Sequence, residues 1–115
     1  MSVKPYTDVP AEPVPGDEVQ DVTMRVVIGP REGAPRFVMR VFEVAPGGYT
    51  PHHQHDFEHE IFFHTGKGEV QHAEDVIPVA PGHTAYVAPM AMHQIRNTGD
   101  EPLVFVCLVP AFVHA

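Results

Sequence analysis

The amino-acid sequence predicts an all-β protein that folds as a single jelly-roll barrel preceded by an irregular N-terminal arm. Short apolar runs recur at a spacing of about ten residues, which is typical of β-sandwiches and jelly rolls. Gly and Pro residues separate these runs and leave no window of helical length. A chain of 115 residues, 43% hydrophobic and 19% charged, is sized for one domain around one core.

The first element is the arm, which we expect over residues 1–20. This segment contains four prolines and several acidic residues, but almost no large apolar side chain. Such a composition favours irregular backbone that lies over the barrel or over a neighbouring subunit. The barrel domain is then expected to span residues 21–115.

Eight strands are predicted in the rest of the chain. In sequence order they are Val22–Ile28, Phe37–Val44, Glu60–Phe63, Glu69–His72, Val76–Val79, Thr84–Ala88, His93–Arg96 and Leu103–Val109. Turn residues outside these runs include Gly29-Pro30, Pro46-Gly47-Gly48, Gly66-Lys67-Gly68, Pro81-Gly82 and Gly99-Asp100. In the second run, apolar residues occupy both alternating faces, so both faces of that strand should be buried.

The charge balance restricts the classes of partner. Seven basic against fifteen acidic residues give a net charge of −8, which repels nucleic-acid phosphates and anionic membrane surfaces. A small-molecule substrate is therefore the expected partner. The single cysteine, Cys107, excludes an intramolecular disulfide, and no apolar run has the length of a signal peptide or membrane span, so we expect a cytoplasmic protein.

Nine histidines stand out in the composition, and several of them cluster within residues 51–60. Side chains alternate in an extended segment, so His53 and His55 should point to one side, roughly 7 Å apart at the backbone. His59 follows a bend and can return to the same centre, and His93 lies far downstream where a strand begins. The other histidines are expected at the surface or beside the site: His52, His64, His72, His83 and His114.

The spacing of these residues resembles the cupin superfamily. Its first motif is a glycine, five residues, His-x-His, three or four residues, a glutamate, six residues and a glycine. The corresponding segment here reads Gly47-x5-His53-x-His55-x3-His59-x6-Gly66. His59 takes the glutamate position because it alone satisfies both the three-residue and the six-residue gaps. Glu60 satisfies only the longer form of the first gap and is the alternative ligand.

The family's second motif is a glycine, five residues, Pro-x-Gly, two residues, His, three residues and Asn. This chain offers Gly82-x6-Pro89-x-Ala91-x-His93-x3-Asn97. The gap after Gly82 is one residue longer, Ala91 replaces the glycine, and one residue is missing before His93. The turn before His93 should therefore differ from the family norm, while His93 keeps its place.

The resemblance implies a cupin jelly roll that holds one divalent transition-metal ion on His53, His55, His59 and His93. With this set of residues, the chain is similar to the small stand-alone bacterial and archaeal cupins that have a four-histidine site. Neutral imidazoles favour Mn, Fe, Co, Ni, Cu or Zn over Mg or Ca, which prefer oxygen ligands. A six-coordinate ion on four nitrogens leaves two positions for water, dioxygen or a chelating substrate.

A second metal motif overlaps the first. The segment His55-Asp56-Phe57-Glu58-His59 spells the H-x-x-E-H pattern of inverted zinc peptidases. That chemistry needs both histidines one turn apart on a helix, and Pro51 and the strand-like residues 61–63 leave little room for one. We therefore prefer the cupin site.

Strand alternation gives four candidates for the wall of the pocket: Arg40, Phe42, Phe105 and Cys107. Arg40 lies within an apolar run, where it either holds an anionic substrate group or extends over the sheet to solvent. Cys107 is either a small core residue or faces the pocket. No distinct acid or base is evident, so Glu60 and Arg40 are the candidates for a catalytic role.

The leading functional hypothesis is a metal-dependent oxidoreductase, dioxygenase-like, that acts on a small organic molecule. An isomerase or lyase on the same scaffold is an alternative, and so is a module that binds or senses a small molecule or metal without turnover. Exposed strand edges favour self-association, and we expect a homodimer.

Overall fold

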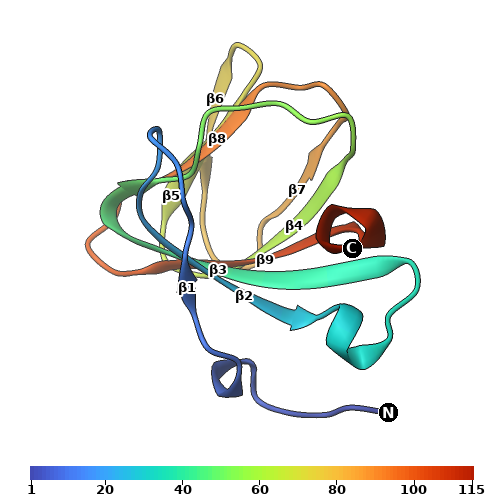
Figure 1. Ribbon diagram of the computed structural model, residues 1–115. Coiled ribbons are helices and arrows are strands. Elements are labelled where there is room, and N and C mark those ends of the chain that lie inside the picture. Colours follow the sequence, from blue (N-terminus) through green and yellow to red (C-terminus); the bar gives the residue numbers. More distant parts are fainter.

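A computed structural model describes residues 1–115 and shows one antiparallel sheet of nine strands that curls into a barrel (Figure 1). The strands are β1 Glu12–Pro13, β2 Gln20–Ile28, β3 Phe37–Tyr49, β4 His59–Thr65, β5 Gly68–His72, β6 Asp75–Val79, β7 Thr84–Val87, β8 His93–Asn97 and β9 Leu103–Pro110. Short 3-10 turns are η1 Tyr6–Asp8, η2 Pro30–Glu32 and η3 Ala111–His114. No helix has the length and apolar character required to cross a membrane.

The strand order is β6-β5-β8-β3-β9-β4-β7, with β2 on β3 and β1 on β2. Strands β5 and β8 form one side of the barrel and β4 and β7 the other, joined along the base by β3 and β9 (Figure 1). Because β3 pairs with both β8 and β9, segments from the middle and the end of the chain meet on it. The all-β jelly-roll prediction is confirmed, and each of the eight expected strands is present.

One local expectation was wrong, and a second holds only in part. The Pro46-Gly47-Gly48 segment does not end a strand, because β3 continues to Tyr49. It forms a bulge instead: Val44 pairs with Val22 and Tyr49 with Gln20, so the extra residues of β3 are accommodated where the φ of Gly47 is 80°. The outer face of β3 is also only partly covered, since Phe37 is 71% exposed.

Part of the N-terminal arm is ordered on the barrel rather than irregular. Strand β1 pairs with β2 through Glu12 and Met24, and η1 precedes it. Val9 is buried against Val27, Val41 and Val104 on the outside of the sheet. The sequence pattern missed β1 because a strand of two residues is too short to show alternation.

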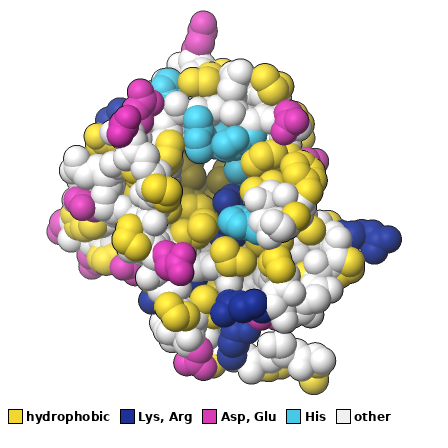
Figure 2. All heavy atoms as spheres, viewed as in Figure 1, with side chains coloured by type: hydrophobic (Ala, Val, Ile, Leu, Met, Phe, Trp, Pro, Cys, Tyr) yellow, Lys and Arg dark blue, Asp and Glu magenta, His cyan; other side chains and the backbone are white.

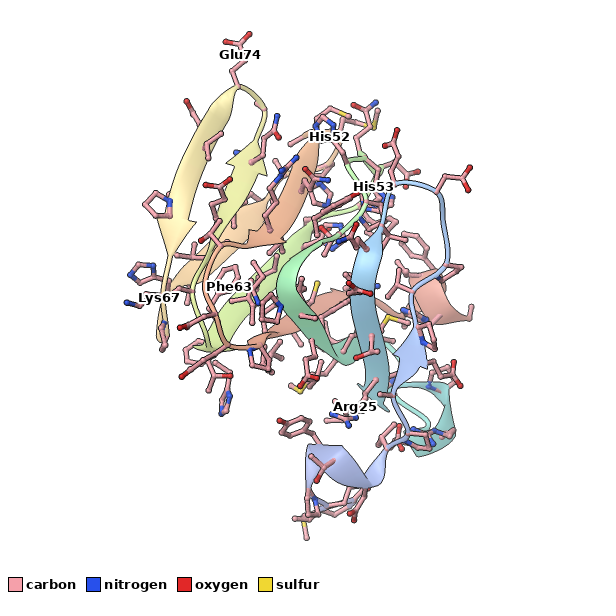
Figure 3. The ribbon with its side chains drawn as sticks, turned by 90° about the vertical axis from the view of Figure 1, so that its left-hand side faces the viewer. Arg25, His52, His53, Phe63, Lys67 and Glu74 are labelled. Carbon is pink, nitrogen blue, oxygen red and sulfur yellow. The ribbon has the colours of Figure 1, made fainter.

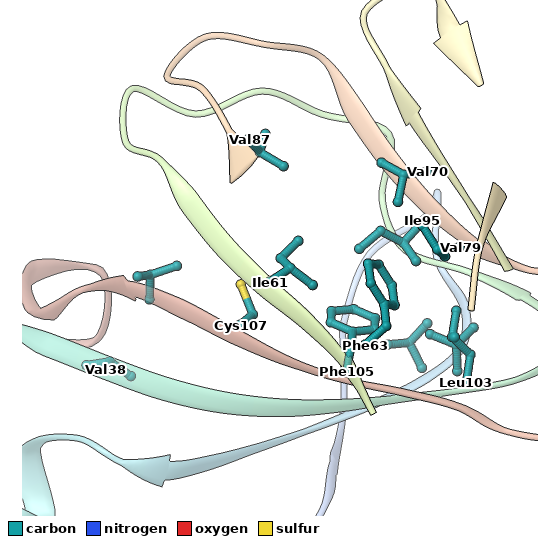
Figure 4. Packing of buried hydrophobic residues seen from close by; sticks show 13 residues of the cluster. Val38, Ile61, Phe63, Val70, Val79, Val87, Ile95, Leu103, Phe105 and Cys107 are labelled. Atoms are coloured by element: carbon teal, nitrogen blue, oxygen red, sulfur yellow. The ribbon is translucent and has the colours of Figure 1, made fainter. Parts of the chain in front are cut away.

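The main core lies inside the barrel, where alternate residues of β4 and β9 face inward. Phe63, Leu103 and Phe105 gather there with Ile95 and other residues of β5, β6 and β8 (Figure 4). The rings of Phe63 and Phe105 lie 5.6 Å apart. Some members of this core also line the adjoining cavity: Ile61, Ile95, Phe105 and Cys107. The core therefore forms the floor of the cavity.

Asn97 holds the turn between β8 and β9 to the rest of the barrel. Its buried side-chain amide donates to the carbonyl oxygens of Val44, at 2.8 Å, and Glu101, at 2.7 Å. Its side-chain oxygen accepts from the Gly99 amide at 2.9 Å. The asparagine of the second motif thus has a structural role, because it satisfies three backbone groups at one point.

Candidate metal centre

Four histidines converge on one end of the barrel from three segments of the chain. His53 and His55 lie in the loop between β3 and β4, His59 begins β4, and His93 begins β8. The backbones of His53 and His93 form a bridge, with N–H···O distances of 3.2 and 2.9 Å. This bridge fixes the loop against β8. In Figure 3, His53 lies near the upper end of the barrel, and Phe63 lies lower within it.

The imidazole nitrogens of three histidines are close enough to share one ion. The ligand atoms of His53, His55 and His93 all lie within 4.8 Å of one another. The Nε2 atoms of His53 and His55 are 3.1 Å apart. Nitrogen ligands about 2.0–2.1 Å from a common ion lie about 3 to 4 Å apart, so the His53–His55 pair is at ligand separation and His93 lies close to it. The donor set therefore fits a divalent transition metal.

His59 lies beside this group with a nitrogen that has no partner. Its ring centroid is 4.9 Å from that of His93 and 5.3 Å from that of His55. The side chain is 5% exposed, and its Nε2 atom is buried without a hydrogen bond. A buried imidazole nitrogen normally finds a partner, so this atom fits a place in the same metal-binding set.

The Nδ1 atoms of His93 and His59 both have contacts that orient the ring, and the contact of His93 also sets its tautomer. The Nδ1 atom of His93 donates to the Ala91 carbonyl oxygen at 3.0 Å, which leaves the Nε2 lone pair free. The Nδ1 atom of His59 lies 3.5 Å from the Cys107 sulfur. In both residues, the nitrogen without such a contact is the one available to an ion.

The electrostatic setting keeps the histidines neutral. Burial is the main cause that lowers the pKa of His53 to about 4 and that of His59 to about 3. Burial also lowers the pKa values of His55 and His93, and for His93 the hydrogen bond that it donates to the Ala91 carbonyl oxygen acts in the opposite direction. Neutral imidazole is the form that binds metals, so these side chains need lose no proton at neutral pH.

The histidines open into a cavity of about 250 Å³. Figure 2 shows histidine side chains gathered at a hollow with largely hydrophobic walls. The cavity is lined by Val14, Met24, Arg40, Phe42, Thr50, Pro51, His53, His55, Phe57, His59, Ile61, His93, Ile95, Phe105, Cys107 and Val113. A larger hollow of about 580 Å³ lies on the outside of β4, β7 and β9, but it contains none of the histidines. The chemistry thus points to the smaller cavity.

The structure brings the four predicted wall residues to this cavity: Arg40, Phe42, Phe105 and Cys107. Cys107 is 2% exposed and also lines the cavity, so it is at once a small core residue and a residue of the pocket wall. Burial raises the pKa of its thiol, against the lowering effect of Arg40.

Glu60 is not brought to the cavity. It is exposed and lies on the outer face of β4, since His59 and Ile61 on either side of it face inward. We therefore take Glu60 neither as a ligand nor as an acid or base for this site. His55 and His59 also lie in a loop and at the start of a strand, so the helical peptidase motif is absent.

Phe57 and Val14 are lining residues that the sequence analysis missed. The ring of Phe57 stacks on that of His55, with centroids 4.6 Å apart and 7° between the planes. The alternation that joined His53 and His55 also includes Phe57, so a signal for it was present. Val14 comes from the N-terminal arm, where no pattern in the sequence indicated a contact with the cavity.

Comparison with known proteins adds a family and several relatives. The profile of the cupin domain family matches residues 40–109. A 1-methylthio-D-xylulose 5-phosphate methylsulfurylase from Rhodospirillum rubrum is 34% identical over 73 residues, which are 64% of this chain and 47% of the relative. The chain thus spans about half the length of that curated relative.

Two solved structures resemble the whole chain. The polyketide cyclase RemF from Streptomyces resistomycificus has a TM-score of 0.90 and 31% identity, and the match covers 96% of this chain and 80% of RemF. A cupin-2 domain from Rhodospirillum rubrum has a TM-score of 0.83 and 28% identity, covering 96% of this chain and 74% of that one. The barrel and its N-terminal segment are therefore shared with proteins of known structure.

Proposed function

Because this chain belongs to the cupin family, we propose that it is a metal-dependent enzyme that acts on a small organic molecule inside the barrel. The observation that carries the proposal is the group of His53, His55 and His93, with ligand atoms within 4.8 Å of one another at a cavity of about 250 Å³. Structural metal sites are closed, whereas catalytic sites keep an open position toward a cavity.

We include His59 as the fourth ligand, through its Nε2 atom. Support comes from the burial of that atom without a partner and from the proximity of its ring to His93. One divalent ion of Mn, Fe, Ni, Co, Cu or Zn suits these ligands. Such an ion supplies Lewis acidity, and a redox-active one also transfers electrons. The remaining residues of the cavity would bind and orient the substrate and exclude water.

For the reaction we retain the dioxygenase-like oxidoreductase as the first candidate. Imidazole ligands suit the redox-active ions Fe, Cu and Ni as well as Zn, and four of them on a six-coordinate ion leave positions for dioxygen or a chelating substrate. The cavity walls also include no acid, so Arg40 is the single charged residue beside the histidines.

A second candidate is a lyase, isomerase or cyclase that does not consume dioxygen. The similarity to a polyketide cyclase over 96% of the chain favours it, as does the partial match to a methylsulfurylase. The third candidate is a module that binds or senses a small molecule or metal without turnover. Oxygen uptake by the iron-loaded or manganese-loaded protein with a substrate panel separates the first candidate from the other two.

We also propose that the protein is a homodimer and works in the cytoplasm. Phe62 and Tyr86 are 47% and 59% exposed on the adjacent strands β4 and β7, around the larger outer hollow. A second copy of the chain is the partner that such a largely apolar face suits, since Glu60 is the one charged residue lining it. The cytoplasmic assignment rests on Cys107, a free thiol in the core.

Elemental analysis of purified protein tests the metal proposal. Wild type should carry about one ion per chain, and His53→Ala, His93→Ala and His59→Ala should each reduce affinity at least about tenfold. His52→Ala is the matched control, because His52 neighbours the site in sequence but does not line the cavity. A wild type that takes up none of the six metals would refute the proposal.

A further inference from the structure

Arg40 carries a positive charge into the cavity without a negative partner. No aspartate or glutamate lines the cavity, and the one ion pair in the structure joins Lys4 to Glu32. A guanidinium in a largely apolar site normally pairs with a carboxylate or another anion. The charge of Arg40 is therefore unbalanced by the protein itself.

The contacts of Arg40 are weak for a guanidinium. One terminal nitrogen donates to the Cys107 sulfur at 3.2 Å, and the other lies 3.5 Å from Nε2 of His114. The charge also lies over the Phe42 ring, 4.9 Å from its centroid. The Nε atom is buried with no hydrogen-bond partner at all. A planar guanidinium has five donors, so most of its hydrogen-bonding capacity is unused.

The position of Arg40 links it to the histidines. The Cys107 sulfur contacts a terminal nitrogen of Arg40 and also lies 3.5 Å from Nδ1 of His59. Only one side chain thus separates the guanidinium from the candidate metal ligand. A small molecule in the cavity can meet both at once.

We propose that the substrate is a compact organic oxyanion whose carboxylate, or an equivalent oxyanion, is bound by Arg40. This inference rests on the proposed function and names its substrate class. Arginine forms paired, charge-assisted hydrogen bonds with carboxylates, which satisfies the free donors and neutralises the partly buried charge. The rest of the substrate contacts the apolar walls, including Phe42 and Phe105. A second polar group of the substrate points toward the histidines. The volume of about 250 Å³ restricts this class to small molecules.

Salicylate and salicylamide are a matched pair of probes, because they share a ring and a phenol and differ in the charge of one group. Isothermal titration of the zinc-loaded protein should show at least about tenfold tighter binding of salicylate. Zinc is chosen because it has no redox chemistry. Arg40→Gln should abolish the preference, and Arg40→Lys should retain part of it. Lys67→Gln, an equal charge change at an exposed turn, should leave it intact.

The result separates this inference from the metal proposal. Metal-free protein should show the same preference more weakly, because Arg40 is in place without an ion. A chain that takes up no zinc but still prefers salicylate through Arg40 would refute the metal proposal alone. Equal affinity for the two probes, no measurable salicylate binding, or a preference that survives in a folded Arg40→Gln variant would overturn the substrate class.

Discussion

Burial determines the protonation state of the histidines in the cavity. It lowers the pKa of His53 to about 4 and that of His59 to about 3, from an ordinary value of 6.5. Between these values, the unfolded chain binds protons that the folded chain does not. The same burial that prepares the imidazoles for a metal thus makes folding of the metal-free chain sensitive to acid.

We expect the free energy of unfolding of the metal-free protein to fall as the pH decreases from about 6.5 toward about 4. Above about pH 6.5, both states hold neutral imidazoles and this contribution stays constant. Urea denaturation at a series of pH values measures the slope. His53→Asn should flatten it, whereas His64→Asn, on the outer face of β4, should not. A wild-type slope identical to that of His53→Asn would contradict this explanation.

The candidate ligands could be predicted from spacing, which favoured His59 over Glu60 but left Glu60 open as the alternative. The two are neighbours, so one of them must face inward and the other outward once β4 forms. The register of β4 decides, and it is set by pairing of His59 with Val87 and of Glu60 with Tyr86. Those contacts are distant in sequence. That Arg40 lacks an acidic partner could likewise not be predicted, because the sequence does not show which residues line the cavity with it.

Glycine conformation controls how the strands of the barrel are connected. Gly66 and Gly82 both have positive φ, at 86° and 88°. A Cβ atom at Gly66 would meet the Pro102 carbonyl oxygen and lie 2.8 Å from the Leu103 Cα, whereas at Gly82 nothing lies within 4 Å. The β4–β5 turn at Gly66 therefore packs directly on the start of β9.

Gly66→Ala and Gly82→Ala form a matched pair that separates backbone strain from steric overlap. Gly82→Ala should lower the free energy of unfolding by about 1 kcal/mol, through the positive φ alone. Gly66→Ala should lower it by about 3 kcal/mol, because the backbone at residues 102 and 103 must also move. Urea denaturation of both variants measures the difference. Equal losses would mean that the contact with β9 does not constrain the turn.

Alternation and turn residues predicted the positions of the strands well. The predicted strand ends were wrong where pairing with a strand distant in sequence determines them. Strand β3 extends past Pro46-Gly47-Gly48 because β2 and β8 continue to pair with it as far as Tyr49. Strand β1 exists only through its pairing with β2. Neither partner is identifiable from the local pattern, which shows apolar periodicity and turn residues but not which strands become neighbours.

The molecule as a whole has the histidine cavity inside the barrel and an apolar hollow on its outer surface. The outer hollow over β4, β7 and β9 is larger than the cavity, at about 580 Å³, and Glu60 is the one charged residue lining it. Strand β7 also ends the strand order, so its outer edge lacks a partner. A face of this kind next to an open edge is where proteins associate or are otherwise protected.

Sedimentation equilibrium of the wild type should therefore show a dimer, and Phe62→Glu should convert it to a monomer by placing a charge in the apolar face. Val76→Glu is the matched control, because Val76 is 58% exposed on β6, at the opposite end of the strand order. The metal content of Phe62→Glu should equal that of the wild type, since Phe62 does not line the cavity. A monomeric wild type would exclude the dimer. A dimer that Val76→Glu disrupts and Phe62→Glu leaves intact would place the interface away from this face.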